Sequence, residues 1–175
     1  MKPDYENIPS SLKALDRWVV WKLENRNGKR TKPPYVAATG PERHALVNVK
    51  TTWRTFADAV AAYGAGKYDG VGFVLGNGII GFDFDHATDE MVAEARSLGT
   101  YTEWSPSGTG VHVIGRSPLV VKGRKKGSVE FYATGRYFTV TGNIVAGSPP
   151  DIREIPEDRL RAFLKKHFDE KIAVP

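Results

Sequence analysis

The stretch Gly81-Phe82-Asp83-Phe84-Asp85-His86 closes an apolar run that begins at Val71. Side chains alternate between the two faces of a β-strand, so both phenylalanines can enter a core while both aspartates project from the opposite face. Two adjacent carboxylates repel each other unless a cation lies between them, and oxygen ligands suit a hard divalent ion. The stretch therefore predicts a strand that carries a divalent-metal site. The alternative is an edge-strand turn with two solvated acids.

The composition is that of a globular chain of 175 residues, with 41% hydrophobic and 26% charged residues. This size predicts one domain, or one domain with a small appendage. The sequence has no cysteine, which excludes disulfides, thiol nucleophiles and zinc sites that use Cys. The N-terminus has no apolar core like that of a signal peptide, and no apolar run reaches membrane-spanning length. We expect a cytoplasmic protein with no membrane partner.

The net charge of +5 comes from 25 Lys and Arg against 20 Asp and Glu. Seven of the basic residues fall in two predicted loops, one with Lys29, Arg30 and Lys32, the other with Lys122, Arg124, Lys125 and Lys126. Beside an acidic metal site, such loops suit contacts to phosphate groups. The second loop is also predicted to be poorly ordered without a ligand, because its four like charges repel and Gly123 and Gly127 add no rigidity. The alternative for either cluster is an ordinary solvated loop.

Hydrophobic periodicity and turn signals predict an α+β chain with a mixed or antiparallel sheet flanked by helices. Helices are expected over residues 8–15, 51–63, 88–98 and 156–168. Strands are expected over residues 17–23, 71–75, 79–85, 101–104, 111–116, 128–132 and 136–141, with a loop or hairpin over 25–41. Gly76-Asn77-Gly78 is a strong hairpin signal, which predicts that the strands on either side pair with each other.

A second motif is Ser105-Pro106-Ser107-Gly108-Thr109-Gly110-Val111-His112. A Gly/Ser loop of this kind exposes successive backbone N–H groups, which can bind an anion. The loop leads into a predicted strand on which His112 and Arg116 share a face. We expect the loop and His112 to face the same cleft as the two aspartates. The alternative is a tight turn followed by a structural histidine.

A third motif is Val129-Glu130-Phe131-Tyr132, in which alternation turns Glu130 away from its two apolar neighbours. From an adjacent strand, Glu130 could join Asp83 and Asp85 in a three-carboxylate site able to hold two divalent ions. The alternative is an exposed strand glutamate.

These three motifs, in this order and extended through Gly142, resemble the catalytic domain of the primase–polymerases of phages and plasmids, in the archaeo-eukaryotic primase superfamily. Three upstream segments also resemble that group: Arg17-Trp18-Val19-Val20-Trp21-Lys22, Lys32-Pro33-Pro34-Tyr35 and Tyr68-Asp69-Gly70-Val71-Gly72-Phe73. The resemblance covers roughly residues 8 to 145, and the combination of motifs is specific although each one alone is weak.

The resemblance implies template-directed nucleotidyl transfer, as a DNA primase or DNA polymerase, on a fold with an RRM-like sheet and an N-terminal α/β unit. It implies that Asp83, Asp85 and Glu130 are catalytic ligands of two Mg²⁺ or Mn²⁺ ions. It also implies that His112 contacts the incoming triphosphate, and that Arg136 does so from a basic position just after Glu130.

The small residue before this histidine is Gly110, where many relatives have serine. A hydroxyl donor is thereby lost, and Ser107 or Thr109 could replace it. The nucleotide-binding residues expected from this loop are Ser107, Gly108, Thr109 and Gly110.

The expected partners are a single-stranded DNA template with its primer, and dNTP or NTP substrates. The seven basic loop residues named above would contact the DNA backbone. Residues 1–145 would form the catalytic domain, and residues 146–175 a linker and C-terminal helix leading to an accessory or helicase region. The sequence would then be a truncated piece or a stand-alone catalytic core, in a host cytoplasm. A non-catalytic single-strand binder and a metal-dependent nuclease are the competing functions.

Overall fold

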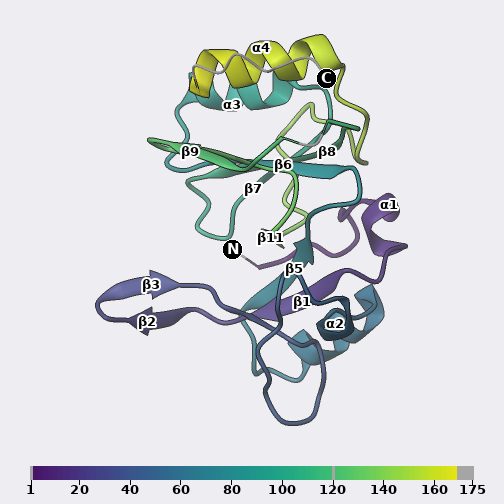
Figure 1. The fold of residues 1–175 in the computed structure, drawn as a ribbon. Coiled ribbons are helices and arrows are strands. Elements are labelled where there is room, and N and C mark those ends of the chain that lie inside the picture. Colours follow the sequence, from purple (N-terminus) through teal and green to yellow (C-terminus); the bar gives the residue numbers. More distant parts are fainter. Residues whose placement is uncertain (1, 120, 169–175) are drawn as a thin grey trace.

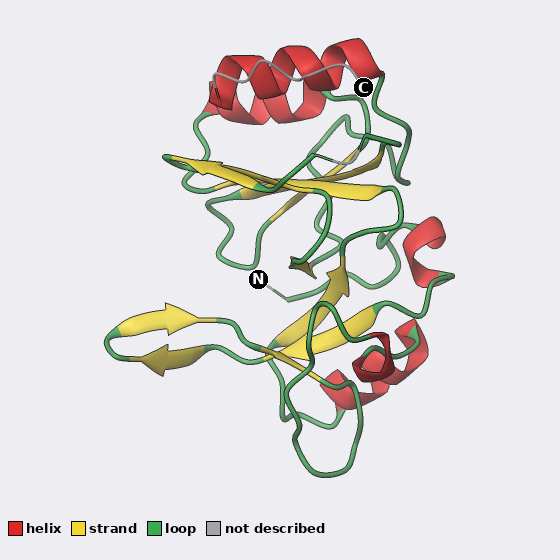
Figure 2. Cartoon of the chain, in the orientation of Figure 1, coloured by secondary structure: helices red, strands yellow, loops and turns green. Residues whose placement is uncertain are grey.

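The computed structural model describes residues 2–119 and 121–168, and it is α+β with antiparallel sheets flanked by helices (Figures 1 and 2). Two sheets dominate these residues, one of five strands and one of four, and a separate two-stranded hairpin projects from the body. The prediction of an α+β chain with antiparallel pairing is confirmed. Within the described part of the chain, no helix has the length and hydrophobicity needed to cross a bilayer.

The five-stranded sheet carries the predicted metal-binding strand at its centre. Its order is β7 (Tyr101–Trp104), β8 (Val111–Arg116), β6 (Ile79–Phe84), β10 (Val129–Tyr132) and β9 (Arg124–Lys126). Helices α3 (Asp89–Ser97) and α4 (Glu157–Phe168) lie over one face of this sheet (Figure 1). Phe82 and Phe84 of β6 pack on that face against Phe163 of α4, with ring centroids 4.9 and 5.8 Å from it. The two phenylalanines therefore enter the core as the alternation predicts.

The four-stranded sheet forms the other half of the molecule. Its order is β11 (Tyr137–Val140), β5 (Gly70–Val74), β1 (Trp18–Trp21) and β4 (Pro34–Tyr35). Helix α2 (Phe56–Gly64) packs on β1 and β5, where Trp18 is fully buried between Phe56 and Phe73. The short helices α1 (Ser10–Lys13) and η1 (Lys50–Thr52) complete this half.

Side-chain caps set the starts of two helices. Thr55 and Asp58 form a capping box at the start of α2, so this helix begins later than the predicted residue 51. Thr88 accepts the N–H of Met91 at 3.3 Å, and α3 starts after it as predicted.

The projecting hairpin is β2 (Glu24–Arg26) and β3 (Lys29–Thr31), which confirms the hairpin alternative for residues 25–41 (Figure 1). Its turn is Asn27-Gly28, with φ of 52° and 76°, a left-handed pair typical of a tight two-residue hairpin turn. Basic residues of one predicted loop therefore stand on a structured arm.

The hairpin predicted at Gly76-Asn77-Gly78 is wrong. A single antiparallel bridge between Gly76 and Ile79 closes the turn, but β5 and β6 then enter different sheets. Each strand already has a neighbour on both edges, β1 and β11 for β5, β8 and β10 for β6. With both edges occupied, the two strands have no free backbone groups with which to pair.

The second predicted basic loop is also wrong in part. Arg124, Lys125 and Lys126 form the edge strand β9, paired with Phe131, Glu130 and Val129 of β10. Gly127, at φ 60°, makes the tight turn between the two strands, and backbone pairing outweighs the repulsion of the like charges. The prediction of a poorly ordered loop fails for these residues.

The C-terminal segment packs on the five-stranded sheet. Leu160, Phe163 and Leu164 of α4 are buried in the same cluster as Phe82 and Phe84. The division at residue 145 stays a prediction, and the end of the predicted 146–175 segment lies outside the described residues.

Candidate metal centre and adjoining pocket

Antiparallel register places one polar residue from each strand of the five-stranded sheet in a single line. We call this line, Glu103, His112, Asp83, Glu130 and Lys125, the polar row. Each member lies directly opposite the next on the neighbouring strand. Side chains directly opposite each other on one sheet face are in contact range. On the three middle strands, β8, β6 and β10, the residues on either side of the row point the other way, into the core beneath α3 and α4.

Three acids converge at the middle of this row. Asp83, Asp85 and Glu130 each offer a carboxylate oxygen, and these oxygens lie within 4.8 Å of one another. The prediction that the three carboxylates converge from neighbouring strands is confirmed, while their role as metal ligands stays a prediction. Asp85 follows the end of β6 and is exposed, Asp83 is half-buried and Glu130 is buried. The cluster is open on one side, so an ion can reach it from solvent.

The surroundings of Asp83 disfavour its charged form, first through burial and then through the neighbouring carboxylates. Burial raises the pKa of Asp83, the nearby His112 opposes that rise, and the carboxylates of Asp85 and Glu130 add to it. The net pKa lies above the ordinary value of an aspartate. A bound cation would relieve this repulsion and favour the charged carboxylate.

Glu130 has cationic neighbours at the outer end of the row. Lys125 Nζ pairs with Oε1, while the Tyr132 hydroxyl donates to Oε2 at 2.7 Å and Arg136 reaches Oε2 at 3.4 Å. Burial raises the pKa of Glu130, but the hydrogen bonds from Lys125 and Tyr132 outweigh it and hold the pKa below its ordinary value. Lys125, predicted as a contact to nucleic acid from a basic loop, thus pairs with the acid cluster.

His112 lies on β8, directly opposite Asp83, as predicted. Its Nε2 is 3.6 Å from Asp83 Oδ1, and its Nδ1 is 3.0 Å from the carbonyl oxygen of Thr139. Burial lowers the pKa of His112, but Asp83 and Glu103 outweigh this effect and raise it above its ordinary value. The ring is buried, yet it forms part of the wall of a pocket.

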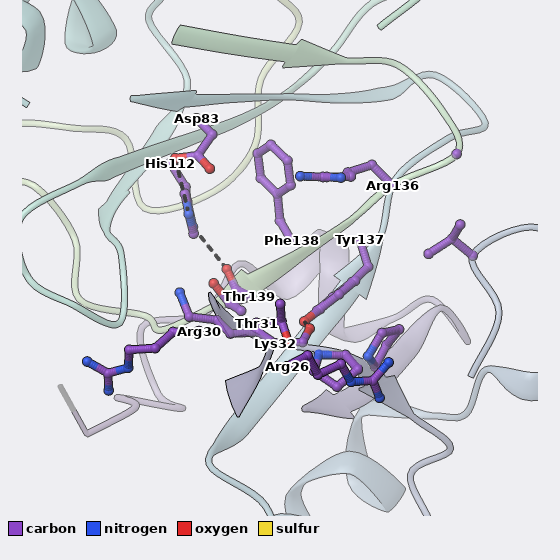
Figure 3. Close-up of a pocket in the computed structure, with 14 residues that line it drawn as sticks. Arg26, Arg30, Thr31, Lys32, Asp83, His112, Arg136, Tyr137, Phe138 and Thr139 are labelled. Atoms are coloured by element: carbon purple, nitrogen blue, oxygen red, sulfur yellow. Dashed lines mark hydrogen bonds and ion pairs between the residues drawn. The ribbon is translucent and has the colours of Figure 1, made fainter. Parts of the chain in front are cut away.

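This pocket has a volume of about 600 Å³ and lies between the two halves of the molecule (Figure 3). Asp83 and His112 come from the five-stranded sheet, and Tyr137, Phe138 and Thr139 from β11 of the other sheet. Its cationic side chains are Arg26, Arg30, Lys32 and Arg136. A pocket of this size with convergent polar groups is typical of a small-molecule site. The cations beside an acidic cluster suit an anionic ligand that brings its own metal.

Three of the four cations in the pocket are among the predicted site residues: Arg30, Lys32 and Arg136. Sequence reasoning missed Arg26, whose place on β2 follows from the Asn27-Gly28 turn that folds it beside β3. The predicted contacts Lys29, Lys122, Arg124 and Lys126 do not line this pocket.

The structure does not bring the Ser107–Gly110 loop into the pocket wall. Its N–H groups already have partners: Gly108 donates to the Ser105 carbonyl at 2.8 Å, Thr109 to Ser107 Oγ at 3.3 Å, and Gly110 to Ser105 Oγ at 3.2 Å. A loop whose donors are satisfied internally has fewer left for an anion. Its role in nucleotide binding stays a prediction.

Gly110 has a packing reason to be glycine. A Cβ at this position would lie 2.9 Å from the carbonyl oxygen of Phe84, closer than side chains pack against backbone. The serine that many relatives of the resembled family carry would therefore clash in this structure.

Sequence reasoning also missed Glu103, the inner end of the polar row. It is fully buried and faces His112 across β7 and β8. A signal was present, because a short loop between two predicted antiparallel strands places position 103 opposite position 112. The contact between Glu103 and His112 forms only because β7 and β8 pair with each other in this register.

No family model matches the chain. The chain is 35% identical over 188 aligned residues to a DNA primase-polymerase from Nitratiruptor phage NrS-1, and the match covers 95% of this chain. The chain spans about a quarter of that relative's length, since the match covers 25% of it. The resemblance to a phage primase–polymerase, predicted from the order of the motifs, is confirmed.

Proposed function

We propose that this chain is the catalytic domain of a primase–polymerase, which joins nucleotides on a DNA template during phage or plasmid replication. The observation that carries the proposal is the convergence of three carboxylates, within 4.8 Å, at the edge of a pocket lined by four cationic side chains. The similarity to the phage primase-polymerase supports the same reaction class. On this proposal the five-stranded sheet is the RRM-like unit of the primase fold, and the four-stranded sheet with α2 is the N-terminal unit.

The donor set fits a pair of Mg²⁺ or Mn²⁺ ions. Asp83, Asp85 and Glu130 supply only carboxylate oxygens, the ligands that hard divalent ions prefer. Burial is the main cause of the raised pKa of Asp83, and the neighbouring carboxylates of Asp85 and Glu130 add to it, so a cation bound here would favour the charged form. When bound, the ions would activate the attacking 3′-hydroxyl and stabilise the leaving pyrophosphate.

The pocket would hold the incoming dNTP or NTP with its triphosphate toward the polar row. Arg136 and Lys32 would neutralise phosphate charge, and His112, in the form with both ring nitrogens protonated, would donate from Nε2. Arg30 and Arg26, on the projecting hairpin, close the pocket on the far side from Asp83 (Figure 3). The triphosphate would thus bind between the two halves of the molecule.

Single-stranded template and primer would bind to the basic surfaces outside the pocket. Lys29 stands on the exposed hairpin, Lys122 precedes edge strand β9, and Arg124 and Lys126 lie on that strand, on the sheet face opposite the polar row. Contacts of this kind read the phosphate backbone and carry no sequence preference.

A primer-extension assay tests the proposal, with a primed DNA template, dNTPs and Mn²⁺ or Mg²⁺. Asp85→Ala should abolish template-directed extension, because it removes an exposed ligand without disturbing the core. Glu90→Ala is the matched control, an exposed acid of α3 outside the cluster, and should extend the primer like the wild type. Shortened DNA would identify a nuclease instead. Binding without any change in DNA length would identify a non-catalytic binder.

A further inference from the structure

Glu103 is a buried carboxylate that the proposed reaction does not use directly. Its side chain is 0% exposed, on β7 at the inner end of the polar row. A buried charge is costly unless it is paired and hydrogen-bonded. A carboxylate at this position therefore indicates a role that an apolar side chain could not perform.

Its hydrogen bonds hold the carboxylate in one orientation. The Tyr101 hydroxyl donates to Oε2 at 2.6 Å, the N–H of Thr141 donates to both oxygens at 3.0 Å, and the N–H of Gly142 donates to Oε2 at 2.9 Å. Two of these donors are backbone groups just after β11, in the other half of the molecule. Glu103 thus links the two halves at the base of the pocket.

The same carboxylate faces the His112 ring. Glu103 Oε1 lies 3.4 Å from His112 Nδ1, and the carbonyl oxygen of Thr139 lies 3.0 Å from the same nitrogen. Two acceptors at Nδ1 place a proton on that nitrogen. The ring is then oriented with Nε2 toward Asp83 and the pocket, and its face against Phe138 at 5.1 Å between centroids.

We propose that Glu103 is a positioning residue for nucleotide binding, which holds the His112 imidazole so that Nε2 faces the pocket. Buried partners of this kind set the orientation and tautomer of a functional histidine. The proposal rests on the proposed function, since that assigns a nucleotide to the pocket. The competing explanation is that Glu103 only joins the two halves of the molecule.

The test is a double-mutant cycle on binding of dATP with Mn²⁺, measured by calorimetry. Glu103→Gln keeps the shape of the side chain and an oxygen for the backbone N–H groups, but it loses the charge that faces Nδ1. It should weaken dATP binding about tenfold, with binding of a single-stranded oligothymidylate unchanged. In a His112→Ala background, the same substitution should have no further effect on dATP, because its action passes through the ring.

Equal weakening of dATP binding in both backgrounds would overturn the inference in favour of a purely structural link. An unchanged affinity in the wild-type background would also overturn it. If His112→Ala itself leaves dATP binding intact, the nucleotide site of the proposed function fails, and Glu103 has no such role.

A second variant keeps the test available if Glu103→Gln does not fold. Tyr101→Phe removes one donor to Glu103 while leaving the carboxylate and His112 in place. It should weaken dATP binding about twofold, and this loss should vanish in the His112→Ala background. A loss that persists there would contradict the inference.

Discussion

The polar row contains two buried glutamates, Glu103 on β7 and Glu130 on β10, that have different surroundings. Glu103 and Glu130 are both buried, at 0% and 3% exposure. Glu103 is held by backbone N–H groups and by the fully buried Tyr101. Glu130 is held by long side chains that reach in from the surface, since the Lys125 and Arg136 side chains are 58% and 51% exposed. The donors therefore differ in exposure, although the two acids are both buried.

This difference suits Glu103 to holding His112 in place and suits Glu130 to binding a ligand. Backbone donors cannot leave Glu103 without unfolding part of the chain, so these hydrogen bonds persist as long as the protein is folded. Exposed cations can leave Glu130 at low cost, because surface ion pairs contribute little to stability. On the proposed function, Glu130 would therefore exchange Lys125 for a metal ion. The four predictions that follow test this contrast, from the largest expected effect to the smallest.

Removing the carboxylates of Asp83 and Asp85 should have the largest effect on activity. The double substitution Asp83→Ala with Asp85→Ala should abolish primer extension, because the proposed ions lose two ligands. The melting temperature should stay unchanged or rise, since repulsion with Glu130 is relieved. Extension assays and thermal melts measure both. A large fall in the melting temperature would show that the acids stabilise the fold instead.

Replacing each buried glutamate with leucine should lower the free energy of unfolding by different amounts. Glu103→Leu should lower the free energy of unfolding by about 3–5 kcal/mol, because it leaves buried N–H donors and His112 without their partner. Glu130→Leu should cost about 1 kcal/mol or less, because its cations return to water. Urea unfolding of both variants gives the comparison. Equal losses of unfolding free energy in the two variants would contradict the difference inferred between Glu103 and Glu130.

A matched pair of tyrosines repeats the test with smaller changes. Tyr101→Phe removes a hydroxyl donor from Glu103, and Tyr132→Phe removes one from Glu130. The first should lower the free energy of unfolding by about 1–2 kcal/mol and the second by about 0.5 kcal/mol, since the donor to Glu130 is more easily replaced. Each variant serves as the control for the other, because the change in shape is the same.

Removing the cation at Glu130 should strengthen metal binding. Lys125→Ala frees Oε1 of Glu130, so Mn²⁺ no longer competes with an ammonium group. Its affinity should rise about fivefold, the equivalent of roughly 1 kcal/mol, as measured by titration of the protein without nucleotide. Lys122→Ala is the control, because it removes an exposed positive charge outside the polar row and should leave the affinity close to the wild type. A weaker affinity in Lys125→Ala would mean that Lys125 assists the metal.

Strand alternation explains why the acid cluster could be found before the fold. Asp83 and Asp85 share a face because they are two residues apart, and Glu130 lies opposite Asp83 because both strands are antiparallel neighbours. Alternation is a property of a few consecutive residues, so the shared face of the two aspartates needs no long-range information. The pairing that places His112 and Glu130 opposite Asp83 joins distant segments, and it was expected from the family resemblance instead of from the local pattern.

Local sequence patterns could not show which distant strands pair with each other. The turn at Gly76-Asn77-Gly78 has the local chemistry of a hairpin, yet β5 and β6 diverge because each is an interior strand of its own sheet. The basic segment around Lys125 resembles a loop, yet β10 offers it a free edge. The availability of an edge depends on the whole sheet and leaves no local signal.

By itself, the sequence determined the α+β class, the face of β6 that carries the acids, and the order of motifs that resembles phage primase–polymerases. Those features depend on residue types and on short spacings, which act within a single strand or turn. Tertiary structure alone decided that Arg26 would line the pocket, that Lys125 would pair with Glu130, and that Glu103 would lie behind His112. Each of these contacts joins segments whose approach depends on the packing of two sheets, because burial and register are properties of the assembled molecule.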